Sequence, residues 1–154
     1  MSDKHLAPKA QNECFEAGLK LLQSGAYWEA HEAWEDLWRS LPSNSSAGLA
    51  TKALIQFAAI CYKPEQAAAG RDEAGIQRGM QTLLQTARRH LDDSSALPAP
   101  EPRWNRDQLR QALQDLQSVL DRWCKRQLLA EVRAEVGDIA THFDPRAQRS
   151  SPSK

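Results

Sequence analysis

The sequence predicts an all-α protein: an antiparallel helical bundle of four core helices followed by a C-terminal helical extension. Three observations lead to this prediction. Eight prolines divide the chain, and the long segments between them are rich in Ala, Leu, Gln, Glu and Arg, which are good helix formers. Apolar residues within these segments recur at intervals of three and four, as on one face of a helix. Val, Ile and Thr are sparse and never alternate with polar residues, so no strand is indicated.

The four core helices are expected between residues 11 and 92. Their expected ranges are 11–24, 27–41, 47–63 and 72–91. Gly25 follows the first range as a C-terminal stop, and Pro42 and Pro64 end the second and the third because proline does not continue a helix interior. The third helix is apolar almost all round, so we expect it to be the most buried of the four.

A single domain is expected from the length of 154 residues. Its expected parts are a bundle over residues 12–92, a Pro-rich linker over 93–104, a C-terminal helical extension over 105–140 and a disordered tail over 141–154. Asn105 is the expected N-cap of the extension because its side chain can accept a hydrogen bond from the first helical turn.

Apolar residues in the extension form a heptad seam. The seam consists of Leu109, Leu113, Leu116, Leu120 and Trp123, which alternate at steps of four and three. The phase of the pattern slips after Trp123, which predicts either one kinked helix or two helices. Such a seam can cover the bundle or mediate self-association, so a homo-oligomer is one possible outcome.

Charge and hydropathy exclude several classes of protein. The chain has 20 basic and 20 acidic residues, and no basic tail or stripe indicates nucleic-acid binding. The longest apolar run, residues 57–62, is far shorter than a membrane span, and the first ten residues lack the apolar core of a signal peptide. Three widely separated cysteines support neither a disulfide framework nor a zinc site. We therefore expect a soluble cytoplasmic protein.

The second helix carries the most informative pattern. On a helical wheel centred on Trp34, the apolar residues of the helix fall within about 60° of the centre. His31 lies at the border of this stripe and Glu35 on its shoulder one turn later, within reach of the imidazole. Glu32 points toward water, and Trp28 stands about 120° from Trp34.

The short connections between the helices predict which residues lie at the same level. Counting outward from each turn puts His31 level with Gly18 on the first helix and with Gln56 on the third, and puts Gln56 level with Gly79. Polar side chains facing two glycines predict a small polar pocket around His31. In a competing interpretation, Gln56 simply belongs to a polar stripe of the third helix.

The second helix also resembles a known family signature. From Gly25 to Trp38 the chain reads G-x-Y-W-E-A-H-E-x-x-E-x-x-W, which resembles the pattern of the domain of unknown function 309 family. Residues 53–63 resemble the Leu-Ile-Gln segment of that family, whereas the chain has a longer insertion where the family has a short Gly-Asn loop. The resemblance covers about residues 12–92. It implies a small all-α bundle from bacteria or archaea, without an established activity.

The preferred function is that of a non-enzymatic binding or interaction protein that takes an unknown small ligand or protein partner and needs no cofactor. The expected ligand-binding or motif residues are His31, Glu32, Glu35, Trp38, Gln56 and Trp28.

A metal-dependent hydrolase is the alternative. The stretch from His31 to Glu35 resembles the zinc motif H-E-x-x-H with its second histidine replaced, so His31 and Glu35 could each donate a ligand to a divalent metal and Glu32 could act as a base. Against this alternative, Glu32 is turned outward, and the candidates for a third ligand, Glu16 and His90, have little support. The sequence does not decide whether the chain is an enzyme.

Overall fold

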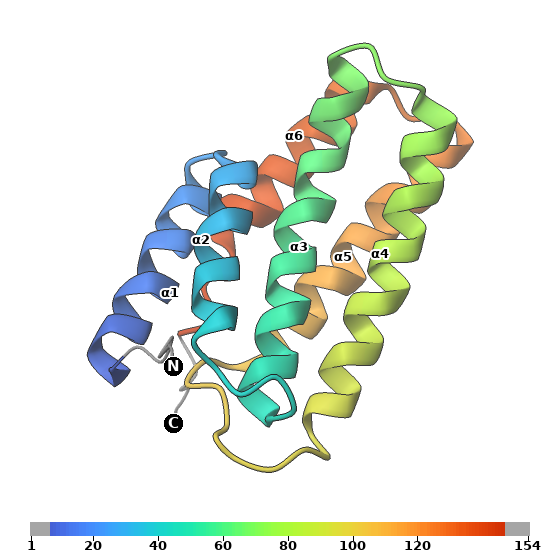
Figure 1. Ribbon diagram of the computed structural model, residues 1–154. Helices are drawn as coiled ribbons and strands as arrows, with labels where there is room; N and C mark the ends of the chain where they lie inside the picture. Colours follow the sequence, from blue (N-terminus) through green and yellow to red (C-terminus); the bar gives the residue numbers. More distant parts are fainter. Residues whose placement is uncertain (1–6, 147–154) are drawn as a thin grey trace, which may run out of the picture.

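The regular structure of the chain is entirely helical over residues 7–146, which are the residues that the computed structural model describes. The helices are α1 (Pro8–Gln23), α2 (Tyr27–Arg39), α3 (Ser46–Ala68), α4 (Glu73–Ser94), α5 (Arg106–Lys125) and α6 (Leu129–His142). Helices α1 to α4 stand side by side in antiparallel order, and α5 and α6 pack behind them (Figure 1). The predicted all-α bundle is confirmed. None of these helices is long and apolar enough to cross a membrane.

The central helix α3 is longer than predicted. The expectation that Pro64 ends it is wrong, because the helix continues through Pro64 to Ala68. A proline inside a helix removes one backbone hydrogen bond and costs about 3 kcal/mol. Burial of Pro64 offsets part of this cost, and the next residue, Glu65, adds a partly exposed pair with Arg133 of α6 at 2.8 Å. Sequence rules for proline do not include such tertiary contacts.

The C-terminal extension consists of two helices, which settles the choice that the sequence left open. Helix α5 ends at Lys125 and α6 begins at Leu129. All five seam residues are buried inside the chain, with at most 3% of their surface exposed. Helix α5 contacts α3 and α4, while α6 contacts α1, α3 and α5. Of the two roles considered for the seam, covering the bundle is the one seen here.

A close contact between α1 and α2 fixes their packing. The indole of Trp34 is fully buried, and its Nε1 donates a hydrogen bond to the Phe15 carbonyl at 3.1 Å. The ring lies directly against Gly18, since a Cβ built at that position would stand 2.2 Å from Trp34 Nε1. No side chain larger than hydrogen fits at position 18 without displacing the tryptophan.

The Pro-rich stretch 93–104 is fastened to the lower end of the bundle. The backbone N–H groups of Ser46 and Ala47, at the start of α3, donate to the carbonyls of Pro98 and Pro100 at 2.8 and 2.7 Å. These bonds satisfy two of the N–H groups that the first turn of a helix leaves unpaired. Trp104 at the end of the stretch is buried, and its ring stacks on Phe15 with 6.1 Å between ring centroids.

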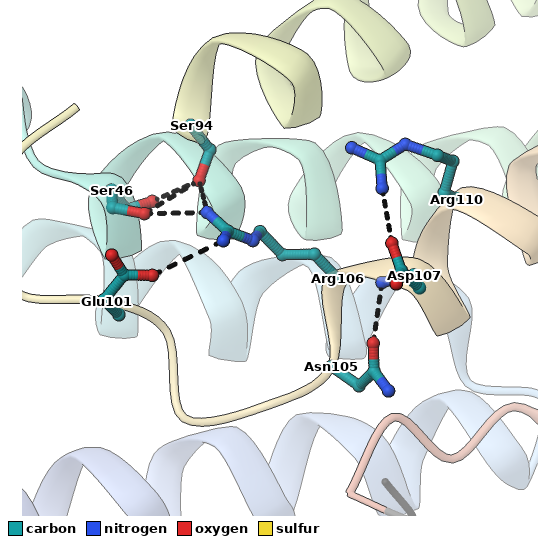
Figure 2. A network of polar contacts seen from close by, with 7 residues as sticks. All are labelled: Ser46, Ser94, Glu101, Asn105, Arg106, Asp107 and Arg110. Atoms are coloured by element: carbon teal, nitrogen blue, oxygen red, sulfur yellow. Dashed lines mark hydrogen bonds and ion pairs between the residues drawn. The ribbon is translucent and has the colours of Figure 1, made fainter. Parts of the chain in front are cut away.

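A polar network joins α3, α4 and α5 at the same end (Figure 2). Ser46 and Ser94 are fully buried, and their hydroxyl oxygens lie 3.1 Å apart. Arg106 donates to both hydroxyls from Nη1, at 2.9 and 2.8 Å, and lies 3.4 Å from Glu101 through Nη2. Arg110 pairs instead with Asp107 at 2.7 Å on the surface (Figure 2).

Residues 141–146, which the sequence assigned to a disordered tail, pack on the bundle. The ring of Phe143 is buried against Phe57 at 4.6 Å between centroids, and Arg146 pairs with Glu16 of α1 at 2.6 Å. An aromatic residue just after a helix signals such packing, but the neighbouring polar residues obscured it. The rest of the expected tail, residues 147–154, lies outside the described residues.

Replacing Gly18 with alanine is expected to destabilise the fold by about 1–3 kcal/mol, because the new methyl group would overlap the Trp34 indole in a packed core. Gly79→Ala is the matched control: its Cβ would meet the flexible end of Lys63 at 3.3 Å, and alanine favours the helix by about 0.5–1 kcal/mol over glycine. Urea unfolding of both variants measures the difference. Equal stability of the two variants would contradict the close Gly18–Trp34 contact.

Arg106→Met is expected to lower the free energy of unfolding by about 1.5–3 kcal/mol, since it removes charge-assisted hydrogen bonds to two buried hydroxyls. The control is Arg110→Met, which has the same change of side chain but loses only exposed ion pairs worth at most about 1 kcal/mol. Methionine and arginine have similar helix propensity, so the comparison isolates the network. An equal loss in both variants would show that the serine contacts contribute nothing.

Candidate functional site

Four side chains of the family-like motif lie along one flank of α2. We call Trp28, His31, Glu35 and Trp38 the motif stripe. Their spacing of three, four and three residues keeps them on one side of the helix. The centre of the stripe is the pair of His31, whose side chain is 16% exposed, and Glu35, whose Oε2 lies 3.9 Å from His31 Nε2. Glu35 also lies 3.6 Å from Arg39, so its negative charge is shared between two partners.

Aromatic contacts hold His31 in place. The ring of Trp28 lies flat on the imidazole, with 4.6 Å between centroids and 9° between the planes. The ring of Trp28 also packs against the ring of Tyr62 on α3, with 5.6 Å between centroids, and Trp28 remains 45% exposed. At the opposite end of the stripe, the Lys52 ammonium lies 5.3 Å from the centre of the Trp38 ring, within range of a cation–π contact. The stripe therefore follows the contact between α2 and α3.

Two nitrogen atoms of the stripe lack a hydrogen-bond partner. His31 Nδ1 and Trp38 Nε1 are both buried, and neither bonds to any residue between 7 and 146. An unpaired buried polar atom costs roughly 1–3 kcal/mol, and most such atoms in proteins are paired. A cavity of about 350 Å³ adjoins Trp38 and is lined also by Arg39, Leu41 and Ser43.

Gln56 lies apart from His31 and binds a different histidine. Its Oε1 is 2.9 Å from His90 Nδ1 of α4, so the imidazole carries a proton on Nδ1 and donates it. Burial, together with the nearby charges of Lys52 and Arg89, lowers the pKa of His90. Lys52 thus lies near both Trp38 and His90. The sequence alone did not indicate Lys52 and Tyr62 as site residues, although the position of Lys52 one turn before Gln56 on α3 is a signal for it.

The two glycines expected beside His31 leave no open space. The indole of Trp34 lies against Gly18, and the side chain of Lys63 lies against Gly79. Counting residues from the turns gave approximate levels along the bundle but could not show which neighbouring side chain fills the space beside each glycine. The polar character of the site comes instead from the unpaired nitrogens of the motif stripe.

The residues of the proposed metal site do not converge. Glu32 is exposed and points toward water, as the wheel predicted. Glu16 pairs with Arg146, and His90 pairs with Gln56, so both candidates for a third ligand are engaged elsewhere. Over the described range 7–146, no cluster of three or more His, Cys, Asp or Glu side chains has a geometry that could hold a metal ion. His31 and Glu35 remain a two-residue pair that can bind water or a polar group.

Comparison with known proteins shows which family this site resembles. No curated protein and no solved structure matches the chain. A family model does match residues 15–74, a segment that begins within α1, contains the motif stripe on α2 and all of α3, and ends at the start of α4. The family is described as a domain of unknown function, DUF309, and the segment of this chain with the motif stripe is similar to it.

Proposed function

We propose that the chain is a non-enzymatic binding protein that recognises a protein partner through the motif stripe of α2. The observation that carries this proposal is the pair of buried nitrogens, His31 Nδ1 and Trp38 Nε1, which have no partner within residues 7–146. Both are enclosed by the chain's own atoms beneath the flank of α2 that a partner would cover. A water molecule held beneath the partner, or a polar group of the partner admitted by a small shift of the side chains above them, would satisfy them and recover the cost of leaving them unpaired.

Trp28 supplies the apolar anchor of the proposed interface. It is one of two large hydrophobic residues that are exposed within the described residues, the other being Leu128 on the far α5–α6 turn. Its contacts with His31 and Tyr62 restrain the ring before any partner arrives. Tryptophan is enriched among residues that dominate binding energy, and a ring that is already restrained loses little entropy on binding.

The charge around the stripe favours a partner with basic groups. Glu29 and Glu32 are exposed on the adjoining surface of α2 and form no ion pair with the described residues. Complementary charges at the rim of an interface speed association and select the partner. We therefore infer a polypeptide segment that carries an apolar side chain for Trp28 and Lys or Arg residues for the two carboxylates.

A catalytic role has less support than binding. Hydrolysis at this site would require a base, a nucleophile and a group that stabilises charge, all directed at one point. His31 and Glu35 lie 3.9 Å apart, but the proposed base Glu32 is exposed and is not in an ion pair with the described residues. The available chemistry is that of a hydrogen-bonding patch.

Trp28→Ala is expected to weaken partner capture by at least about tenfold, since an anchoring tryptophan contributes about 2 kcal/mol or more. The measurement is quantitative affinity capture from the cells that naturally make the protein, with wild type and variant side by side. Leu128→Ala is the matched control, because it removes the other exposed large hydrophobic residue and leaves the stripe intact. Partner recovery that falls equally in both variants, or only in the control, would contradict the proposal.

Metal analysis separates binding from the hydrolase alternative. Protein dialysed against Zn²⁺, Mn²⁺ and Ni²⁺ and then washed is expected to retain the same substoichiometric metal in wild type and in His31→Ala, because His31 and Glu35 alone form too small a ligand set. One bound metal per chain that disappears in His31→Ala would instead favour the hydrolase.

A further inference from the structure

A second cavity opens at the lower end of the bundle, and it shares Leu41 with the cavity that adjoins Trp38. It has a volume of about 300 Å³ and lies between the start of α1, the end of α2, the start of α3 and the Pro-rich stretch before α5. This volume is at the lower end of the range for small-molecule sites in proteins. No step of the proposed function uses the cavity.

One part of the cavity wall is aromatic and apolar. Phe15 and Trp104 stack with only 3° between their planes, and both line the cavity together with Leu37, Leu41 and prolines of the adjoining loops. Aromatic rings and proline faces pack well against a flat ring. Aromatic pairs contribute about 0.5–1.5 kcal/mol in addition to the free energy of burying their surface. The shape and chemistry of the wall suit an aromatic molecule.

A hydroxyl group in the wall is free to bind. Thr51 of α3 lines the cavity and is 99% buried, with 1% of its surface exposed. Its hydroxyl forms no hydrogen bond with any residue in the described part of the chain. A polar atom of a molecule bound in the cavity could therefore form a hydrogen bond with this hydroxyl without displacing one that the chain already makes.

The mouth of the cavity has one unpaired charge within residues 7–146, and it is positive. Arg103 lines the cavity, is exposed and forms no ion pair with the described residues. The other charged groups at the mouth are already paired: Glu101 lies 3.4 Å from Arg106, and Arg146 is held by Glu16 and Asp144 at 2.6 and 2.8 Å. The guanidinium of Arg103 has no negative partner and therefore favours an anion. Its planar set of N–H donors matches the two oxygens of a carboxylate.

We propose that this cavity binds a small, flat aromatic carboxylate that carries a second polar atom on its ring. The ring lies against Phe15 and Trp104, the carboxylate pairs with Arg103 at the mouth, and the second polar atom bonds to the Thr51 hydroxyl inside. The chain then has two sites, one for a protein partner on the α2 flank and one for a small molecule at the end of the bundle.

The test uses 6-hydroxy-2-naphthoate as the probe, because its hydroxyl and carboxylate stand at opposite ends of a flat ring. Titration of the full chain, followed by tryptophan fluorescence and calorimetry, is expected to show saturable binding of one probe per chain. Arg103→Gln is expected to weaken this binding about tenfold and to leave binding of neutral 2-naphthol unchanged. Thr51→Val is expected to weaken binding of the probe several-fold and to leave 2-naphthoate, which lacks the hydroxyl, unchanged.

Two control variants make the result specific. Arg126→Gln removes another exposed arginine that has no side-chain ion pair with the described residues, and Trp28→Ala removes the anchor of the motif stripe; neither is expected to change probe binding. Thermal unfolding confirms that each variant is folded. The proposal is overturned by a lack of saturable binding at millimolar probe, or by losses in Arg103→Gln and Thr51→Val no larger than those in the controls.

Discussion

The architecture around the candidate site depends on one packing contact, the indole of Trp34 against the backbone of Gly18. Trp34 is fully buried and bonded to the Phe15 carbonyl, so it fixes how α2 is rotated about its axis. With Trp34 directed at α1, the residues of the motif stripe fall about 40–120° around the helix, all toward α3. Their contacts with Tyr62 and Lys52 follow from this rotation. A close contact inside the core therefore determines which side chains the surface presents.

The same aromatic packing extends to the end of the bundle. Phe15 stacks on Trp34 at 6.3 Å and on Trp104 at 6.1 Å, which joins α2 to the Pro-rich stretch through α1. That stretch in turn receives the first N–H groups of α3, and Arg106 connects the ends of α3 and α4 to α5. The C-terminal helices are therefore part of the folded unit, although the family match ends at residue 74.

What the sequence could predict was mainly local. The wheel of α2 correctly placed Trp34 inside, Glu32 in water and His31 beside Glu35, because rotation along one helix follows from its period. Contacts between elements that are far apart in the chain could not be predicted from the sequence. Four such contacts depend on the exact level at which two helices meet. They are the burial of Pro64 inside α3, the stacking of Trp104, the hydrogen bond between Gln56 and His90, and the contact of Lys63 with Gly79. An error of one turn in that level changes every such partner.

The most direct test of the central contact is a nuclear Overhauser measurement between the Gly18 α-protons and the Trp34 indole protons in the native chain. The packing described here predicts a strong cross-peak from Gly18 to the indole N–H, since a Cβ at position 18 would stand 2.2 Å from Trp34 Nε1. It also predicts slow solvent exchange of that N–H, which is bonded to the Phe15 carbonyl. An absent cross-peak, with the Trp34 N–H exchanging as fast as that of exposed Trp28, would contradict the account.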